Sequence, residues 1–148
     1  MNHTNQNQNK IDEHQIEEGS QLLLDFAKLA KISESVLPVI VQHFTTKEVL
    51  ILAYVNQEAF SKSIELGQAV FYSTSRKKLW HKGSTSGDFL TLKEIRVNCE
   101  QNSLLFLVDP VTKGVCHTKD KLGQTRPTCY YRQLKNGELK FIELTNLQ

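Results

Sequence analysis

Short runs of β-branched and aromatic residues, each bounded by polar turn residues, recur along most of this chain from residue 38 onward. Runs of this length and composition are typical of β-strands. Tight turns are expected at residues 45–47 and 136–137, where the second is an Asn-Gly pair that favours a hairpin. The pattern therefore predicts a mainly antiparallel sheet, with strands at residues 38–42, 49–54, 69–74, 90–99, 104–108, 115–118, 129–134 and 139–144.

Two segments show the periodicity of helices instead. From residue 17 to residue 32, apolar side chains such as Leu22 and Phe26 recur at helical spacing, which predicts a short amphipathic helix. Asn56 is a suitable cap for the start of a second helix, and Gly67 is a suitable residue to end it. The expected fold class is α+β, a mainly antiparallel sheet with two short helices.

Length and composition favour one globular domain. A chain of 148 residues, 39% of them hydrophobic and 23% charged, can form one core. Residues 1–15 are rich in Asn, Gln and His and predict a disordered tail, so residues 16–148 are expected to form the domain. No apolar run reaches the roughly 20 residues that cross a bilayer, and the start lacks the apolar stretch of a secretory signal. We expect a cytoplasmic protein with no membrane partner.

The formal net charge of +2 argues against nucleic acid as a partner, since nucleic-acid-binding domains carry a dense basic surface. It suits a pocket for one small anionic metabolite, such as a nucleotide. Residues 73–88 form a long polar stretch whose basic side chains, hydroxyls and glycine amides are typical phosphate donors. A solvated basic loop with Trp80 anchored in the core is the alternative. The candidates for substrate binding are Arg76, Trp80, Lys82, Gly83, Thr85 and Ser86.

The three cysteines, Cys99, Cys116 and Cys129, are candidate zinc ligands. They form no CxxC motif, and buried apolar thiols are the alternative. Each lies at the end of a predicted strand, and His117 directly follows Cys116. Three protein ligands and one open position are the arrangement of a catalytic zinc, which lowers the pKa of a bound water to about 7. His117 is then a candidate general base, or else a core histidine.

Seven motifs occur in order along this chain, at residues 36–42, 52–56, 72–76, 79–87, 94–99, 116–118 and 129–132. Together they resemble the phosphoribosyl-AMP cyclohydrolases, over roughly residues 36 to 132. The resemblance implies a zinc-dependent hydrolase that opens the adenine ring of 1-(5-phosphoribosyl)-AMP between N1 and C6, in histidine biosynthesis. It also implies an intertwined homodimer, in which Cys99 of one subunit shares zinc with Cys116 and Cys129 of the other.

The sequence departs from the pattern of this family at its magnesium site. Where the family has Asp-Cys-Asp-x-Asp, this chain has Asn98, Glu100 and Asn102 around Cys99. Magnesium prefers anionic oxygens, so two amides are expected to weaken or abolish this site. His43 and Ser84 replace acidic residues of the family, and residues 119–128 form a longer segment than the family norm.

Two further readings follow from these departures. The first alternative to a phosphoribosyl-AMP cyclohydrolase is a divergent paralog that hydrolyses another purine-like nucleotide. The second is a non-catalytic zinc-binding dimer. Retention of Trp80, Lys82 and His117 argues against the second, because metal storage needs none of them. The chain has no counterpart of the downstream domain of bifunctional relatives, so another protein is expected to supply the preceding pyrophosphohydrolase step.

Overall fold

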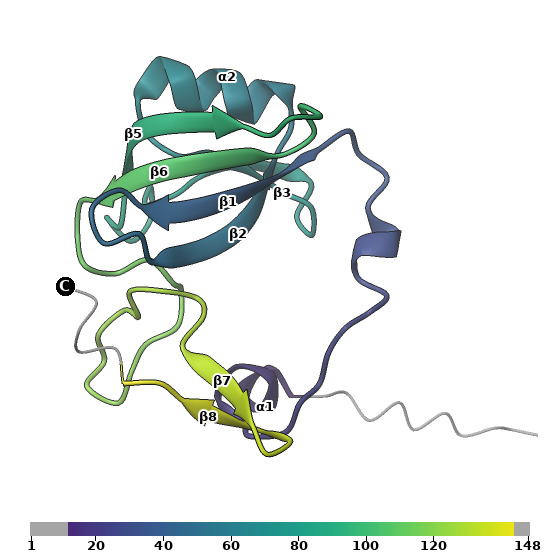
Figure 1. Ribbon diagram of the computed structural model, residues 1–148, viewed down its shortest axis with the longest axis vertical. Helices are drawn as coiled ribbons and strands as arrows, with labels where there is room; N and C mark the ends of the chain where they lie inside the picture. Colours follow the sequence, from purple (N-terminus) through teal and green to yellow (C-terminus); the bar gives the residue numbers. More distant parts are fainter. Residues whose placement is uncertain (1–11, 144–148) are drawn as a thin grey trace, which may run out of the picture.

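The computed structural model describes residues 12–143 and shows two parts (Figure 1). A four-stranded sheet with α2 forms one part, and the β7–β8 hairpin with α1 forms the other. The helices are α1 (Glu13–Glu18), the 3₁₀ helix η1 (Leu29–Lys31) and α2 (Gln57–Leu66). The strands are β1 (Leu37–His43), β2 (Val49–Val55), β3 (Val70–Ser73), β4 (Lys78–His81), β5 (Leu90–Val97), β6 (Leu104–Pro110), β7 (Arg132–Lys135) and β8 (Glu138–Phe141).

The four-stranded sheet has the order β2-β1-β6-β5. The β1–β2 and β5–β6 pairs are antiparallel, whereas β1 and β6 run parallel. Strands β3 and β4, and strands β7 and β8, form two antiparallel hairpins of their own. The predicted α+β class with a mainly antiparallel sheet is confirmed, with β1–β6 as its parallel pair.

One face of the sheet carries the core. In β1, Val39 and Val41 are fully buried while Ile40 between them is 43% exposed, as expected from the alternation of side chains along a strand. On the buried face, Phe106 of β6 stacks on Phe71 of β3 with ring centroids 6.3 Å apart. The β3–β4 hairpin therefore closes one side of the core.

The predicted second helix is confirmed as α2. The side chain of Asn56 accepts a hydrogen bond from the N–H of Ala59 at 2.8 Å, which caps the first turn. Gly67 has a φ of +64°, a conformation that few other residues adopt, and it ends the helix. The hydroxyl of the fully buried Ser63 bonds both the N–H and the carbonyl of Val70, which ties α2 to β3.

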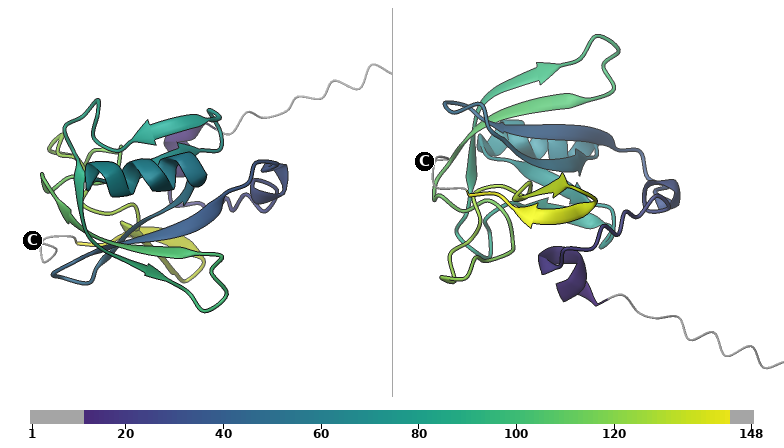
Figure 2. Two further views of the ribbon diagram at one scale, coloured as in Figure 1. Left: turned by 90° about the horizontal axis from the view of Figure 1, so that it is seen from above. Right: turned by 60° about the horizontal axis from the view of Figure 1, so that its bottom comes forward.

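The predicted first helix is wrong in position. The structure places α1 at Glu13–Glu18 and leaves residues 19–28 without regular structure (Figure 2). Leu24 and Phe26 are 64% and 89% exposed, so the apolar stripe of this segment has no core to pack on among residues 12–143. Because a short helix depends on such packing, periodicity alone does not form it.

Two further predictions need correction. The polar stretch 73–88 contains strand β4, because Trp80 pairs with Phe71 and packs on the core. Residues 115–118 form a loop rather than a strand, since the N–H groups of Val115 and Cys116 both donate to one carbonyl, that of Arg126.

Near the two ends of the chain, the predicted segments and the described structure differ in their bounds. The predicted tail at residues 1–15 lies outside the described residues as far as residue 11, and its last residues belong to α1. The strand predicted for residues 129–134 begins only at Arg132, and the one predicted for residues 139–144 is β8, with residue 144 outside the described range. None of the helices within residues 12–143 combines the length and apolar character needed to span a membrane.

Candidate functional site

Cys116 and Cys129 lie together beside one end of the four-stranded sheet. Cys116 is 4% exposed and sits in the loop after β6, where its N–H donates to the carbonyl of Arg126 at 2.9 Å. The N–H of Cys129 donates to the carbonyl of Leu50 in β2 at 2.8 Å. These main-chain bonds place Cys129 close enough to Cys116 to change the pKa of both thiols.

The contact between the two sulfurs favours a thiolate. Chiefly because of the hydrogen bond from Cys129, the pKa of Cys116 is lowered to about 5. Thr118 adds to this effect, with its hydroxyl oxygen 3.1 Å from the sulfur of Cys116. The same hydrogen bond raises the pKa of Cys129. At neutral pH the pair therefore shares one proton, and a thiolate is the form of cysteine that binds metal.

Lys82 places a buried positive charge beside the pair. Its side chain is almost fully enclosed, and its ammonium donates to the carbonyl of Asp88 at 3.2 Å. Burial lowers the pKa of Lys82, while the negative charges of Asp88, Cys129 and Cys116 act in the opposite direction. The buried carboxylate of Asp88 accepts a hydrogen bond from the hydroxyl of Thr112. Sequence reasoning selected Lys82 but missed Asp88, whose signal was a single acid at the end of a basic stretch.

Cys99 lies elsewhere, in the turn between β5 and β6. The register pairs Leu90 with Pro110 at one end of this hairpin and Val97 with Leu104 at the other. Cys99 follows Val97 and the Cys116 loop follows Pro110, so these cysteines lie beyond opposite ends of a hairpin about 20 Å long. Figure 1 shows the strands of this hairpin, β5 and β6. The chain brings together two of the three predicted zinc ligands.

The three positions of the family's magnesium site are bonded to one another. The side-chain amide of Asn98 donates to the side-chain oxygen of Asn102 at 2.6 Å, and the amide of Asn102 donates to Glu100 at 3.1 Å. The N–H groups of Asn102 and Ser103 both donate to the side-chain oxygen of Asn98. The donor set does not fit magnesium, because two amide NH₂ groups lie where the ion needs oxygen ligands.

His117 is exposed, unlike its buried neighbour Cys116. Its side chain is 79% exposed, and Nε2 lies 2.8 Å from Oε1 of Glu17 in α1. The alternative of a core histidine is therefore wrong. Glu17 is a contact that sequence reasoning missed, since 100 residues separate the two along the chain.

The predicted substrate-binding residues fall into separate groups. Arg76 lies exposed in the turn between β3 and β4. Lys82 and Gly83 are buried at the other end of β4, and Thr85 and Ser86 are exposed in the turn that follows. Trp80 is half-buried and packs on Phe71 with ring centroids 5.6 Å apart.

Gly83 has a conformational reason for its position. Its φ is +98°, and a side-chain carbon placed there would lie 2.4 Å from the N–H nitrogen of Phe89. Only glycine fits this turn without a shift of the backbone. The turn in consequence brings Lys82 back toward Asp88.

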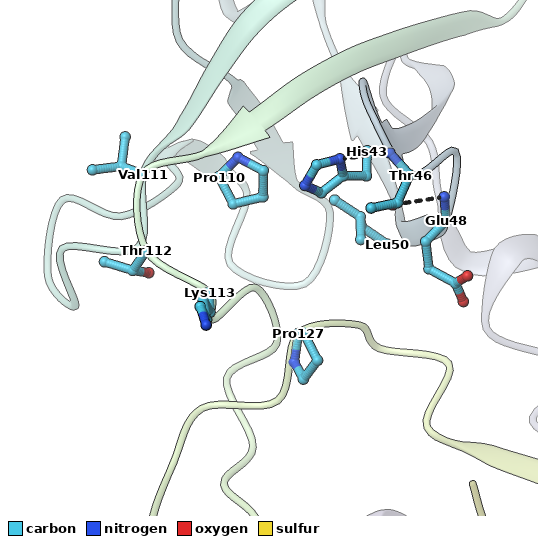
Figure 3. Close-up of a pocket in the computed structure, with 9 residues that line it drawn as sticks. All are labelled: His43, Thr46, Glu48, Leu50, Pro110, Val111, Thr112, Lys113 and Pro127. Atoms are coloured by element: carbon cyan, nitrogen blue, oxygen red, sulfur yellow. Dashed lines mark hydrogen bonds between the residues drawn. The ribbon is translucent and has the colours of Figure 1, made fainter. Parts of the chain in front are cut away.

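Neither of two cavities formed by the described residues contains the predicted site residues. One, of about 190 Å³, lies between the β1–β2 turn and the segment after β6 and is lined by His43 (Figure 3). Nδ1 of His43 accepts the N–H groups of Thr45 and Thr46, so this departure from the family pattern stabilises a turn. The other, of about 690 Å³, lies between α1 and residues 120–127.

The thiols fit zinc only in part. Thiolate sulfur is a preferred zinc ligand, and Cys116 and Cys129 supply two such atoms. Among residues 12–143 there is no group of three His, Cys, Asp or Glu side chains placed to hold a metal ion. A third ligand, such as Cys99, would have to come from a second copy of the chain.

Known proteins with similar sequences share this region. The family model for phosphoribosyl-AMP cyclohydrolase matches residues 51–131. A phosphoribosyl-AMP cyclohydrolase of Solibacter usitatus is 41% identical over 120 residues, which cover 81% of this chain and 87% of that protein. One of Methanosarcina mazei is 44% identical over 117 residues, covering 79% of this chain and 90% of that protein.

A bifunctional relative is longer than this chain. The histidine biosynthesis bifunctional protein HisIE of Aquifex aeolicus is 37% identical over 113 residues. The match covers 76% of this chain and 52% of that protein, so the chain spans about half the length of that relative. The match to relatives thus covers the region that contains the thiol pair, Lys82 and His117.

Proposed function

The chain belongs to the phosphoribosyl-AMP cyclohydrolase family of histidine biosynthesis, and we propose that it hydrolyses the adenine ring of 1-(5-phosphoribosyl)-AMP between N1 and C6. In this reaction water adds to C6, the C6–N1 bond breaks, and a proton is transferred to N1. The observation that carries the proposal is the thiol pair Cys116 and Cys129, which lies beside the buried Lys82. His117 directly follows Cys116 in the sequence.

The proposal includes a zinc ion held by Cys116, Cys129 and Cys99. When bound at such a site, zinc supplies a water of lowered pKa and a Lewis acid for the ring carbon. The low pKa of Cys116 supports this assignment, because a ligand that is already a thiolate needs no proton removed before it binds metal.

The site is proposed to form between two subunits. One chain holds two thiols at one end of the β5–β6 hairpin and the third at the other end, and neither cavity includes them. The outer face of the sheet offers a surface for a second copy, since Ile40 and Leu52 are paired neighbours there and are 43% and 50% exposed. An apolar sheet face of this kind is typical of a subunit interface.

In this proposal the chain's own residues bind the nucleotide and move protons. His117 takes a proton from the attacking water and delivers it to N1, a role for which histidine is the commonest side chain. Arg76, Lys82, Thr85 and Ser86 offer donors to the phosphate groups, with Arg76 able to reach a different group from the others because it lies at the far end of the hairpin.

The test is turnover of 1-(5-phosphoribosyl)-AMP by purified protein, with zinc content measured on the same sample. Ring opening that stops on chelation and returns with zinc is the expected result. Bound zinc without turnover of this nucleotide would instead favour a paralog with another purine-like substrate. The longer segment 119–128, which lines the larger cavity, is the feature that favours such a change.

A further inference from the structure

We propose that Glu17 is a positioning residue for His117, which it orients through a hydrogen bond to Nε2. The inference rests on the proposed function, because it assigns a task to the residue that transfers the proton there. It concerns α1, which lies outside the residues 51–131 that match the family model.

The contact fixes which nitrogen of the ring carries hydrogen. A carboxylate can only accept, and Oε1 of Glu17 lies 2.8 Å from Nε2 of His117, so Nε2 must donate. In the neutral ring the unprotonated nitrogen is then Nδ1, which is left free to take a proton. Without this partner the ring, whose side chain is 79% exposed, would exchange freely between its two neutral forms.

Glu17 is itself held in place by contacts to its own main chain and to the two residues that follow it. The next residue, Glu18, binds the guanidinium of Arg126 through both oxygens, at 2.7 and 3.0 Å. The hydroxyl of Tyr131 donates to the main-chain carbonyl of Glu17 at 2.9 Å. Arg132 donates to the carbonyl of Gly19 at 3.0 Å. Three residues of the segment that ends in β7 therefore bind α1 and its end beside His117.

The first test compares steady-state kinetics of Glu17→Ala with a matched control. Glu13 lies on the same helix and its carboxylate has no hydrogen bond within the described residues, so Glu13→Ala is expected to leave kcat and KM unchanged. Glu17→Ala is expected to lower kcat about 10-fold to 100-fold, the usual effect of losing the partner of a site histidine, with KM unchanged. Glu17→Gln, which keeps an acceptor oxygen, should lose less. An unchanged or increased kcat in Glu17→Ala would overturn the proposal. Equal losses of kcat in Glu17→Ala and Glu13→Ala, or in Glu17→Ala and Glu17→Gln, would also overturn it.

The second test does not depend on turnover. Long-range ¹H–¹⁵N spectra of the imidazole rings, recorded in mildly alkaline buffer, report which nitrogen carries the hydrogen, and His117→Gln assigns the signals. Wild-type protein should show Nε2–H at His117, and Glu17→Ala should show a mixture of both forms. A wild-type ring with hydrogen on Nδ1 would overturn the proposal. If the proposed function fails, the wild type lacks turnover while the spectra still report on the contact.

Discussion

The two ends of the β5–β6 hairpin hold cysteines in contrasting surroundings. At one end, Cys116 is buried against Thr118, and Cys129, which is itself exposed, lies close enough to lower the pKa of Cys116, beside the ammonium of Lys82. At the other end, Cys99 is exposed in a turn that is held only by hydrogen bonds among its own residues. Three cysteines that look equivalent in the sequence therefore divide into a preformed pair and a single distant thiol.

This difference teaches how the proposed zinc site is divided. In the proposed site, Cys116 at the buried end would be a thiolate before a partner arrives, because the hydrogen bond from Cys129 lowers its pKa. Cys99 at the exposed end would become a ligand only beside a second subunit. Each prediction below changes one or both of the two ends.

The largest effect is expected when either end loses its sulfur. Cys116→Ser and Cys99→Ser should each abolish zinc binding and turnover, because each removes one of three ligands. If the site is shared, a mixture of the two variants refolded together should recover about a quarter of wild-type activity, since half of the dimers are mixed and each contains one complete site. Zinc content and turnover of the mixture are the measurements. No recovery in a mixture shown to contain mixed dimers would contradict a shared site.

The next largest effect should separate metal binding from proton transfer at the buried end. His117→Ala removes an exposed imidazole and no sulfur, so bound zinc should equal that of the wild type. Turnover should fall on the order of 10²-fold or more, the usual contribution of a general acid–base group. His43→Ala is a matched control, because the His43 ring caps the β1–β2 turn and has no hydrogen bond to either thiol among the described residues. Unchanged turnover in His117→Ala would remove its assigned role.

The contrast also shows what sequence alone could predict. The alternation of apolar and polar side chains predicted β1 almost at its observed bounds, and the cap and end residues did the same for α2. In both elements the side-chain pattern matches the packing. Strand β4 escaped detection, since its core contacts come from Trp80 within a basic stretch. The first helix was misplaced because exposed Leu24 and Phe26 lack a core to pack on.

The site shows the same division. Local motifs selected the cysteines, Lys82 and His117 as candidates, because each lies in a short recognisable motif. Glu17 and Glu18 could not be predicted, because their partners His117 and Arg126 lie 100 and 108 residues away. Contacts of this kind depend on how α1 packs, which no local pattern in the sequence encodes.

A smaller effect is expected on stability at the buried end. Arg126 is 6% exposed, binds both oxygens of Glu18 and stacks 4.2 Å from the ring centroid of Tyr131. Arg126→Leu leaves Glu18 without its cation, but that carboxylate is partly exposed, so we expect a loss of about 1–3 kcal/mol rather than the 3–5 kcal/mol of a fully buried pair. Thermal unfolding should show a Tm lower by about 3–10 °C. An unchanged Tm would show that the pair does not hold α1.

The pH dependence of that stability has a definite sign. The hydrogen bond from Arg126 lowers the pKa of Glu18 below its ordinary value, so near that value the unfolded chain binds more protons than the folded one. The contribution of the pair is therefore complete above about pH 5 and is lost as the pH falls through the lowered pKa. Glu18→Gln should make urea unfolding less dependent on pH in this range. An acid slope identical to that of the wild type would contradict the assignment.

The smallest effect concerns magnesium at the exposed end. Since the amides of Asn98 and Asn102 bond each other and Glu100, added magnesium is expected to leave zinc-supported turnover unchanged. The double variant Asn98→Asp, Asn102→Asp puts carboxylates at both positions and should acquire magnesium binding, measurable by calorimetry. Three acids in one turn repel each other, so without magnesium this variant should turn over more slowly than the wild type. If the wild type itself depended strongly on magnesium, the amide turn would be a cation site after all, and the two ends of the hairpin would differ less than their hydrogen bonds indicate.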